Sequence, residues 1–256
     1  MFGLWINIRM RTMPIVCNEL LGRPALKIYQ DPEAFNFSID SMLLADFATV
    51  SLRTRKICDL CTGNAPIPLY LTLRCEAEIV GVEIQKESYD LAVQSIEENH
   101  LEGRIQIILD NLIGISSKIG KSTFDLVTCN PPFFKVGSHQ VNPNDRKAIA
   151  RHEISATLED IVREAALLLN SKGRLAMVHR PDRLLEILEI FKKYRIEPKR
   201  LRFVYPKLGS PCNHILIEGI KDGLAGGLVV LPPLIVYNEN NRWTKEVIKI
   251  YNCDKE

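Results

Sequence analysis

The sequence predicts an α/β domain built on a doubly wound, mostly parallel sheet of seven strands. Short apolar runs alternate with stretches of helical spacing from Lys56 onward. The helical stretches are long enough to cross between neighbouring parallel strands. With 256 residues, of which 46% are hydrophobic, the chain can also bury a large core.

Each predicted strand is a short apolar run bounded by polar or turn-forming residues. The seven strands of the sheet are expected at 57–60, 78–82, 104–109, 124–129, 174–178, 199–204 and 214–218. A further strand is expected earlier, at 26–30, and a turn follows it at 31–33.

Helices are predicted where apolar residues recur at helical spacing. They are expected from the end of loop 61–66 to about residue 74, at 86–100, at 158–170 and at 181–194. Another helix, with Ser38 or Asp40 as its N-cap, contains apolar residues through 48. Lys172-Gly173 should close the helix that ends at 170, and Pro181 suits a first helical turn. We expect residues 1–52 to be an extension packed on a main domain of residues 53–256.

Composition indicates a cytoplasmic protein without a membrane segment. Seven scattered cysteines, an odd number, favour a reducing compartment over a disulfide framework. No apolar run reaches the roughly 18–20 residues that span a bilayer. Arg9 and Arg11 follow the first apolar residues, which is the wrong order for a signal peptide. The net charge of +2 permits a nucleic-acid partner without requiring one.

Polar side chains stand at the ends of three predicted strands, where doubly wound sheets bind ligands. The first strand leads into the small residues of 59–66, which allow a ligand to approach the backbone closely. Glu83 ends the second strand about twenty residues later, the spacing of a ribose-binding carboxylate. Asp110 and Asn111 follow the third strand and can meet an adenine edge. These positions predict a pocket for an adenosine-containing cofactor.

The loop after the first strand is not a phosphate-binding loop. It contains neither Gly-x-Gly-x-x-Gly nor Gly-Lys-Ser/Thr. A nucleoside cofactor without phosphates therefore fits better, and S-adenosylmethionine (SAM) is the obvious one. An enzyme that uses SAM needs only to align a nucleophile with the methyl group.

The fourth predicted strand ends in the corner Asn130-Pro131-Pro132-Phe133. Two prolines cannot continue a strand ladder, because neither has an N–H group. The corner combines an amide side chain, main-chain carbonyls and an aromatic face, which together suit an exocyclic amine on a flat ring. Taken alone, the same residues are equally consistent with a simple proline turn.

Taken together, these motifs resemble the class I methyltransferases that modify exocyclic or amide nitrogens. Within that group the chain is similar to the tRNA-1(Val) (adenine-37-N6)-methyltransferase family over roughly residues 28–251. Further similarities lie at 35–45, 150–153 and 231–237. The chain departs from the pattern at Cys61 and Ala65, where the broader group has glycine.

The resemblance implies a Rossmann-like fold, SAM as cofactor and N6-methylation of an adenosine in tRNA, at position 37 of the anticodon loop. The implied cofactor-binding residues are Asp59, Cys61, Gly63, Asn64, Ala65, Glu83, Ile84, Asp110, Asn111 and Asn130. The implied catalytic residues are Asn130, Pro131, Pro132 and Phe133. The Asn130 side chain and the Pro131 carbonyl would accept hydrogen bonds from the target amine, and Phe133 would stack on the base.

Two basic clusters are candidates for RNA contacts. The first follows the corner and consists of Lys135, Arg146, Lys147 and Arg151. The second consists of Lys192, Lys193, Lys199, Arg200, Arg202 and Lys207, which could equally form an ordinary solvated surface. No obligate protein partner is evident.

Other functions remain open at this point. The corner alone could receive an amine of ribosomal RNA or another planar amine, and the fold could be a non-catalytic binding module. DNA enzymes need a recognition insertion for which the strand spacing leaves no room. Cys58-x-x-Cys61 has no second ligand pair, so we expect no metal. We expect His139, His152, His179 and His214 to be structural or surface groups rather than bases.

Overall fold

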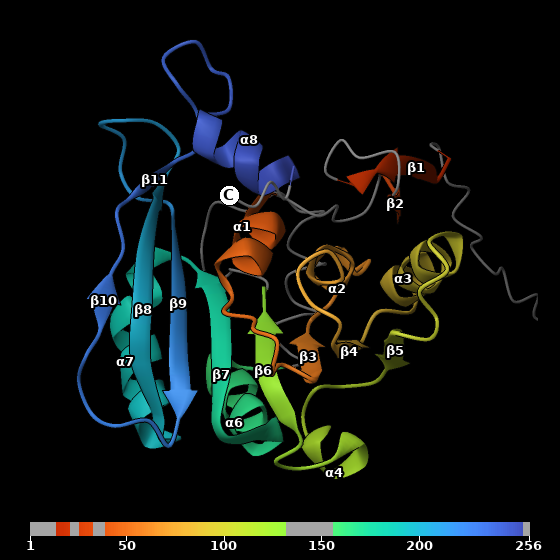
Figure 1. Cartoon of the computed structure of the whole chain (residues 1–256), viewed down its shortest axis with the longest axis horizontal. Helices are drawn as coiled ribbons and strands as arrows, with labels where there is room; N and C mark the ends of the chain where they lie inside the picture. The colour runs from red at the N-terminus through yellow and green to blue at the C-terminus, as the bar shows by residue number, and fades with distance from the viewer. Residues whose placement is uncertain (1–13, 21–25, 33–38, 132–155, 253–256) are drawn as a thin grey trace, which may run out of the picture.

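A computed structural model describes residues 14–20, 26–32, 39–131 and 156–252. Within them lies a nine-stranded sheet in the order β10-β8-β9-β7-β6-β3-β4-β5, with β11 also paired to β8 (Figure 1). The long strands are β3 (Lys56–Leu60), β4 (Glu78–Glu83), β5 (Ile105–Leu109), β6 (Phe124–Cys129), β7 (Leu169–His179), β8 (Ile196–Tyr205) and β9 (His214–Lys221). The short strands are β10 (Val229–Val230) and β11 (Leu234–Ile235).

The sheet is mostly parallel, as predicted. Strands β3, β4, β5, β6 and β7 all run parallel to one another, and β9 is antiparallel to both β7 and β8. The seven predicted strands are all present, and the two-residue strands β10 and β11 are additional. The carboxyl ends of β3, β4, β5, β6 and β7 therefore meet at one edge, where the N-terminal end of β9 also lies.

Helices cover both faces of this sheet. They are α1 (Ile39–Phe47), α2 (Pro66–Leu71), α3 (Lys86–Glu98), α4 (Ser116–Ile119), α6 (Leu158–Leu168), the 3₁₀ turn η2 (Pro181–Arg183), α7 (Leu184–Lys193) and α8 (Lys245–Asn252). None of the described helices is long and apolar enough to cross a membrane.

Two apolar cores lie on opposite faces of the sheet, because successive strand residues point to opposite sides. In β3, Ile57 joins a core with α1, α2, α3 and α8, whereas Cys58 joins a core with α6 and α7. Ile79 and Val80 of β4 divide in the same way. Figure 1 shows α6 and α7 together behind the strands.

The first segments of the chain pack on this domain. Strand β1 (Val16–Glu19) pairs antiparallel with β2 (Lys27–Gln30). The β2 backbone is docked on α3, where the Tyr29 N–H donates to Ser95 Oγ at 2.9 Å. Helix α1 and β2 share one apolar core with α2 and α3. The division of the chain at residue 52 stays a prediction.

The end of α1 is fixed by a buried carboxylate on β9. Glu218 has no exposed surface, and it accepts hydrogen bonds from the Thr49 N–H at 2.7 Å and the Thr49 hydroxyl at 2.8 Å. Arg174 of β7 pairs with the same carboxylate at 2.8 Å. A buried charge in this position requires such partners, so Glu218 holds α1 against the sheet.

The structure corrects two local predictions. Helix α6 ends at Leu168, and the strand that follows begins at Leu169, so Lys172-Gly173 does not close the helix. Lys172 has a φ of 68° and the β6–β7 register shifts in this region, which makes 170–173 a turn-like bulge of β7. Asp40 lies inside α1 and is not its cap, and Ser38 is outside the described residues.

Candidate active site

The loop after β3 has an unusual backbone. Cys61, Gly63 and Ala65 all have positive φ angles, of 59°, 59° and 67°. This left-handed region costs a residue with a side chain about 1–2 kcal/mol, but costs glycine little. The backbone therefore gives a physical reason for the glycines of the broader pattern, and Cys61 and Ala65 adopt the glycine-like shape at a cost.

Asp59 at the end of β3 ties this loop to the sheet. The residue is fully buried, and its two carboxylate oxygens accept from the Thr62 and Thr128 hydroxyls, both at 2.6 Å. Burial raises the pKa of Asp59 to about 7, although the two threonine donors oppose this rise. Asp59 thus links the loop to β6 through Thr62 and Thr128. Its contact with a cofactor stays a prediction.

Glu83 at the end of β4 holds the loop from the other side. Its carboxylate accepts from the Gly63 N–H and from the Gln85 N–H, each at 2.8 Å. Burial raises the pKa of Glu83, and these backbone donors oppose the rise. A carboxylate has about four acceptor sites, so Glu83 can still accept from a ribose hydroxyl of a nucleoside. The neighbouring Ile84 is 41% exposed and offers apolar surface beside it.

Asp110 and Asn111 follow β5 at the same edge. The Asp110 N–H donates to the Glu83 carbonyl at 2.9 Å, which places the two predicted nucleoside-binding residues side by side. The ammonium of Lys118 beside Asp110 lowers the pKa of that carboxyl, and the Asn111 N–H adds to the effect. Asp110 is therefore ionised at neutral pH and can accept from an adenine amine. The Asn111 side chain accepts from the Ile113 N–H at 2.8 Å.

Asn64 has a contact that the sequence did not indicate. Its side-chain nitrogen donates to the Tyr29 carbonyl of β2 at 2.8 Å, and the residue is buried. The side chain thus joins the loop to the first hairpin. Its predicted cofactor contact is not tested by this geometry.

The Asn130 corner begins directly after β6, next to β3 in the sheet. The Asn130 side-chain nitrogen donates to Ser41 Oγ of α1 at 3.0 Å, and Ser41 is buried. Among the described residues, no donor contacts Asn130 Oδ1. The amide is therefore oriented with its oxygen available to accept from a ligand. Ser41 was missed as a partner of the corner, although it lies in the family-like segment 35–45.

Several predicted site residues lie outside the described part of the chain. They are Pro132, Phe133, Lys135, Arg146, Lys147 and Arg151. Pro131, by contrast, is described and is buried. Their predicted roles stay predictions.

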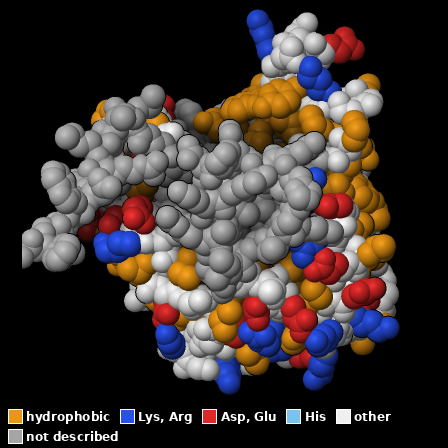
Figure 2. All heavy atoms as spheres, turned by 180° about the vertical axis from the view of Figure 1, so that it is seen from behind, with side chains coloured by type: hydrophobic (Ala, Val, Ile, Leu, Met, Phe, Trp, Pro, Cys, Tyr) orange, Lys and Arg blue, Asp and Glu red, His pale blue; other side chains and the backbone are white. Residues whose placement is uncertain are grey.

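The second basic cluster is largely engaged within the protein. Arg202 pairs with Glu246, and Lys193 pairs with Glu159. Arg200 lies 3.5 Å from the Glu218 carboxylate and over the Phe47 ring, and Lys199 donates to main-chain carbonyls. On the face in Figure 2, basic and acidic side chains are interspersed along the lower part of the molecule. These contacts favour an ordinary structural role for the cluster.

The methyltransferase small domain family model matches residues 34–204 of this chain. The chain belongs to this family. The matched region contains every described residue of the predicted site, from α1 through the Asn130 corner.

Relatives of the chain carry a narrower name. A protein of Porphyromonas gingivalis, named tRNA1(Val) (adenine(37)-N6)-methyltransferase, is 34% identical over 163 residues, which are 62% of this chain and 63% of the relative. A second strain's protein is matched over 56% of its length, so the match spans less than two thirds of either relative. A protein of the same name from Mannheimia succiniciproducens is 26% identical over 237 residues, 87% of this chain and 88% of the relative.

Solved structures show the same fold. A predicted O-methyltransferase from Agrobacterium tumefaciens superimposes with a TM-score of 0.67 and 24% identity, over 83% of this chain and 95% of that one. A geranyl diphosphate C-methyltransferase from Streptomyces coelicolor, in complex with S-adenosyl-L-homocysteine, gives a TM-score of 0.53 and 11% identity over 71% of this chain and 78% of that one. At these identities the likeness concerns the fold alone, which is that of class I methyltransferases.

Proposed function

We propose that this protein is a SAM-dependent methyltransferase that modifies N6 of an adenosine in tRNA, at position 37 of a valine tRNA. The observation that carries the proposal is the Asn130 amide, held by Ser41 beside the loop of β3 with its oxygen available. The names of the relatives support the choice of tRNA as substrate.

The residues at the strand ends fit the proposed cofactor. A Cβ atom added at Gly63 would meet nothing within 4 Å in the described part of the chain, which leaves space beside the loop for a ligand. Glu83 would bind the ribose hydroxyls, Asp110 the adenine amine, and the loop around Gly63 the methionine part. When bound, SAM supplies a methyl group on a positively charged sulfur.

The corner would activate the target amine. The lone pair of adenine N6 is delocalised into the ring, which makes the nitrogen a poor nucleophile. If Asn130 Oδ1 and the Pro131 carbonyl accept hydrogen bonds from its two N–H groups, the nitrogen becomes more pyramidal. Its lone pair is then available for in-line attack on the methyl carbon. Asn130 and Pro131 would hold the nitrogen in place while its bond to the methyl carbon forms and the carbon–sulfur bond breaks, and the nitrogen would then lose one proton to solvent. No strong base is required.

The RNA contacts belong to the same proposal. A base must leave its stack to reach the corner, which costs less in an unpaired loop than in a duplex. The anticodon loop is therefore a suitable target, with Phe133 stacking on the base. Lys135, Arg146, Lys147 and Arg151 would bind phosphates, so binding should weaken steeply as salt is raised.

The decisive experiment is methyl transfer from labelled SAM into total RNA of a cell that lacks this protein, followed by identification of the modified nucleoside. We expect N6-methyladenosine in tRNA. Asn130→Ala should nearly abolish turnover and leave SAM binding largely unchanged, because the amide acts on the acceptor. Label in ribosomal RNA, or on another nucleoside, would overturn the proposed substrate.

A matched control is Asn170→Ala. Its side chain also makes one hydrogen bond, to Asp125 at 3.1 Å, but it lies at the amino end of β7, far from the corner. This variant should methylate RNA at the wild-type rate. Near-wild-type turnover by Asn130→Ala would contradict the proposed mechanism.

A further inference from the structure

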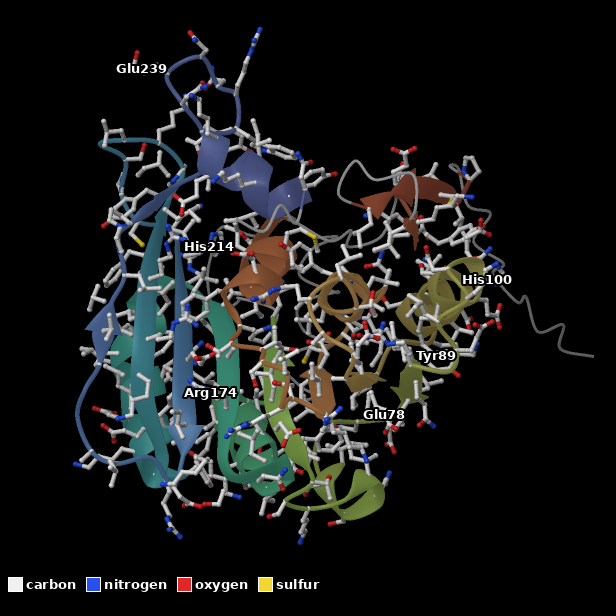
Figure 3. All side chains as sticks on the ribbon, in the orientation of Figure 1. Glu78, Tyr89, His100, Arg174, His214 and Glu239 are labelled. Atoms are coloured by element: carbon white, nitrogen blue, oxygen red, sulfur yellow. The ribbon has the colours of Figure 1, made fainter. Side chains whose placement is uncertain are left out.

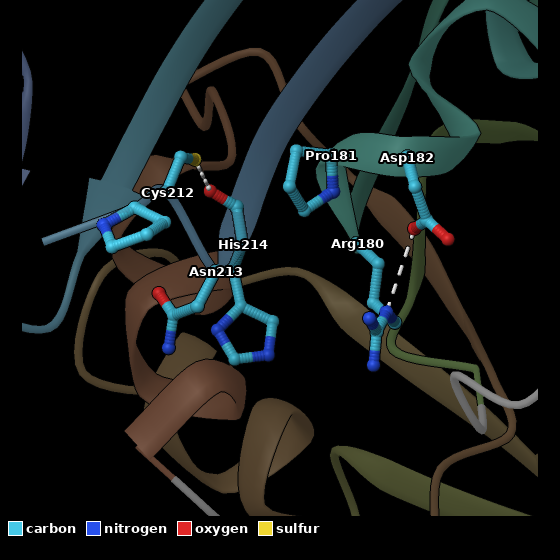
Figure 4. A pocket seen from close by; sticks show the side chains of 7 residues that line it. Arg180, Pro181, Asp182, Cys212, Asn213 and His214 are labelled. Atoms are coloured by element: carbon cyan, nitrogen blue, oxygen red, sulfur yellow. Dashed lines mark hydrogen bonds and ion pairs between the residues drawn. The ribbon is translucent and has the colours of Figure 1, made fainter.

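A pocket lies beside the Asn130 corner, over the ends of β7 and β9 (Figure 4). Its volume is about 350 Å³. Residues that follow β7 form one side, and residues that precede β9 form the other. The pocket is lined by Arg180, Pro181, Asp182, Pro211, Cys212, Asn213 and His214.

The position of this pocket relates it to the corner. In the sheet, β7 lies between β6 and β9, whereas the cofactor loop follows β3 on the other side of β6. Neighbouring strands are about 5 Å apart, so the pocket begins roughly 5–10 Å from the corner. The proposed cofactor site and the pocket therefore flank Asn130 from opposite sides.

Two consecutive residues of α1 connect the pocket to the corner. Asp40 Oδ1 lies 3.4 Å from His214 Nδ1, and Ser41 accepts from Asn130. Figure 3 shows His214 next to α1, at the end of the sheet where the corner lies. Because one helical turn contacts both groups, the pocket and the corner have a fixed relative position.

Asn213 presents an amide to this pocket. The residue is exposed, its backbone N–H donates to the Val204 carbonyl at 3.1 Å, and the Cys212 thiol donates to the His214 carbonyl at 3.1 Å. Among the described residues, the Asn213 side chain makes no hydrogen bond. It thus offers two donors and an acceptor from a fixed backbone, which is the set that reads the edge of a nucleobase.

Arg180 supplies a positive charge on the opposite side. Its side chain is 55% exposed, and among the described residues it contacts only Asp182, at a long 3.4 Å. Figure 4 shows the guanidinium facing the Asn213 and His214 side chains across the pocket. A guanidinium with free N–H groups binds a phosphate through paired hydrogen bonds. The rings of Pro181 and Pro211 add apolar surface.

We propose that this pocket binds the nucleotide adjacent to the target adenosine, with Arg180 on its phosphate and Asn213 on the edge of its base. The inference rests on the proposed function. The cavity volume lies at the lower end of the range for ligand pockets, about 300–1,000 Å³, which suits one nucleotide better than a paired stem. Sequence-specific RNA recognition commonly takes splayed loop bases in this way.

The test pairs Asn213→Ala with RNA stem-loops that are abasic either 5′ or 3′ of the target adenosine. On intact RNA, Asn213→Ala should lower kcat/KM roughly tenfold, and the abasic site in the pocket should do the same to the wild type. Combined, the two changes should cost little more than either one. The inference would be overturned if Asn213→Ala caused no loss on intact RNA. It would also be overturned if the loss from Asn213→Ala multiplied with the loss from the abasic site for both abasic RNAs.

Two controls and a second readout complete the design. Gln106→Ala removes an exposed amide from β5, at the far edge of the sheet, and should have no effect. Arg180→Gln should lower the salt dependence of RNA binding by about one phosphate contact. Arg195→Gln should not, because the Arg195 side chain, which is 79% exposed, lies just before β8, at the end of the sheet away from the pocket.

RNA binding by fluorescence anisotropy on the same protein–RNA pairs separates this inference from the proposed function. If the wild type binds the stem-loop but methylates a different atom, the proposed reaction is wrong. The binding affinities of Asn213→Ala and the abasic RNAs then still test whether the pocket holds the adjacent nucleotide. If the wild type neither binds nor methylates the RNA, both proposals fail.

Discussion

Ser41→Ala tests whether the orientation of the Asn130 amide matters for catalysis. The substitution removes the hydroxyl that accepts from Asn130 at 3.0 Å, in a buried position where water does not replace it readily. One such hydrogen bond contributes about 0.5–1.5 kcal/mol net. If all of it serves to hold the amide for the target amine, kcat falls about 2- to 12-fold.

The assay is the initial rate of methyl transfer at saturating SAM and RNA, with SAM affinity measured by calorimetry. We expect the affinity to stay at the wild-type value, because Ser41 contacts the Asn130 side chain and the proposed SAM contacts lie in the loop after β3. In an Asn130→Ala background the Ser41 substitution should have no further effect, since the group that it orients is already absent.

Thr72→Ala provides the matched control. Its hydroxyl donates to the Leu69 carbonyl at 2.7 Å at the end of α2, away from the corner. The loss of stability should be similar and kcat should not change. If Ser41→Ala lowers the melting temperature as Thr72→Ala does but leaves kcat at the wild-type value, the reasoning is refuted and Ser41 has only a structural role.

Two further predictions concern the buried carboxylates. Glu83→Gln places an amide N–H₂ against a backbone donor, Gly63 or Gln85. The amide also has one acceptor oxygen fewer for the ribose hydroxyls. Loss of one such hydrogen bond, about 1–3 kcal/mol, should raise the calorimetric Kd for SAM roughly 5- to 150-fold. The exposed Glu78→Gln should leave Kd unchanged, and equal affinities of the two variants would contradict the role of Glu83. Because the pKa of Asp59 is raised from 3.8 to about 7, the unfolded chain loses this proton first as pH rises. Protonated Asp59 therefore contributes to the free energy of unfolding, by an amount on the order of 4 kcal/mol, in full below about pH 4, and this contribution is lost by about pH 7. In urea unfolding at pH 5 and pH 8, the wild type should lose stability at the higher pH and Asp59→Asn should not. An equal loss of stability in the two proteins would be evidence against the raised pKa of Asp59.

The strand ends could be predicted from the sequence because each depends on local patterns. Glu83 and Asp110 directly follow apolar runs, and parallel strands bring their carboxyl ends to one edge. The departures at Cys61 and Ala65 were also visible, and the left-handed backbone gives their physical meaning.

Contacts between distant segments had no comparable signal. Ser41 and Asn130 are 89 residues apart, and neither residue has a spacing or composition that indicates the other. The Asn64 contact with Tyr29 is equally non-local, at 35 residues. Helix α8 was not predicted because it has only eight residues, which is too short a stretch for the helical spacing of Val247 and Ile250 to be recognised.

The anchoring of α1 has a consequence for the order of folding. Helix α1 is made early in synthesis, but Thr49 at its end is held by Glu218, 169 residues later in the chain. Its contact with Asn130 therefore becomes secure only after β9 has been translated and inserted between β7 and β8. Pairing across such separations is slow, because loop closure precedes the stabilising contacts. A growing chain thus contains the loop after β3 long before the contact between Ser41 and Asn130 is secured, so the proposed catalytic geometry is completed late.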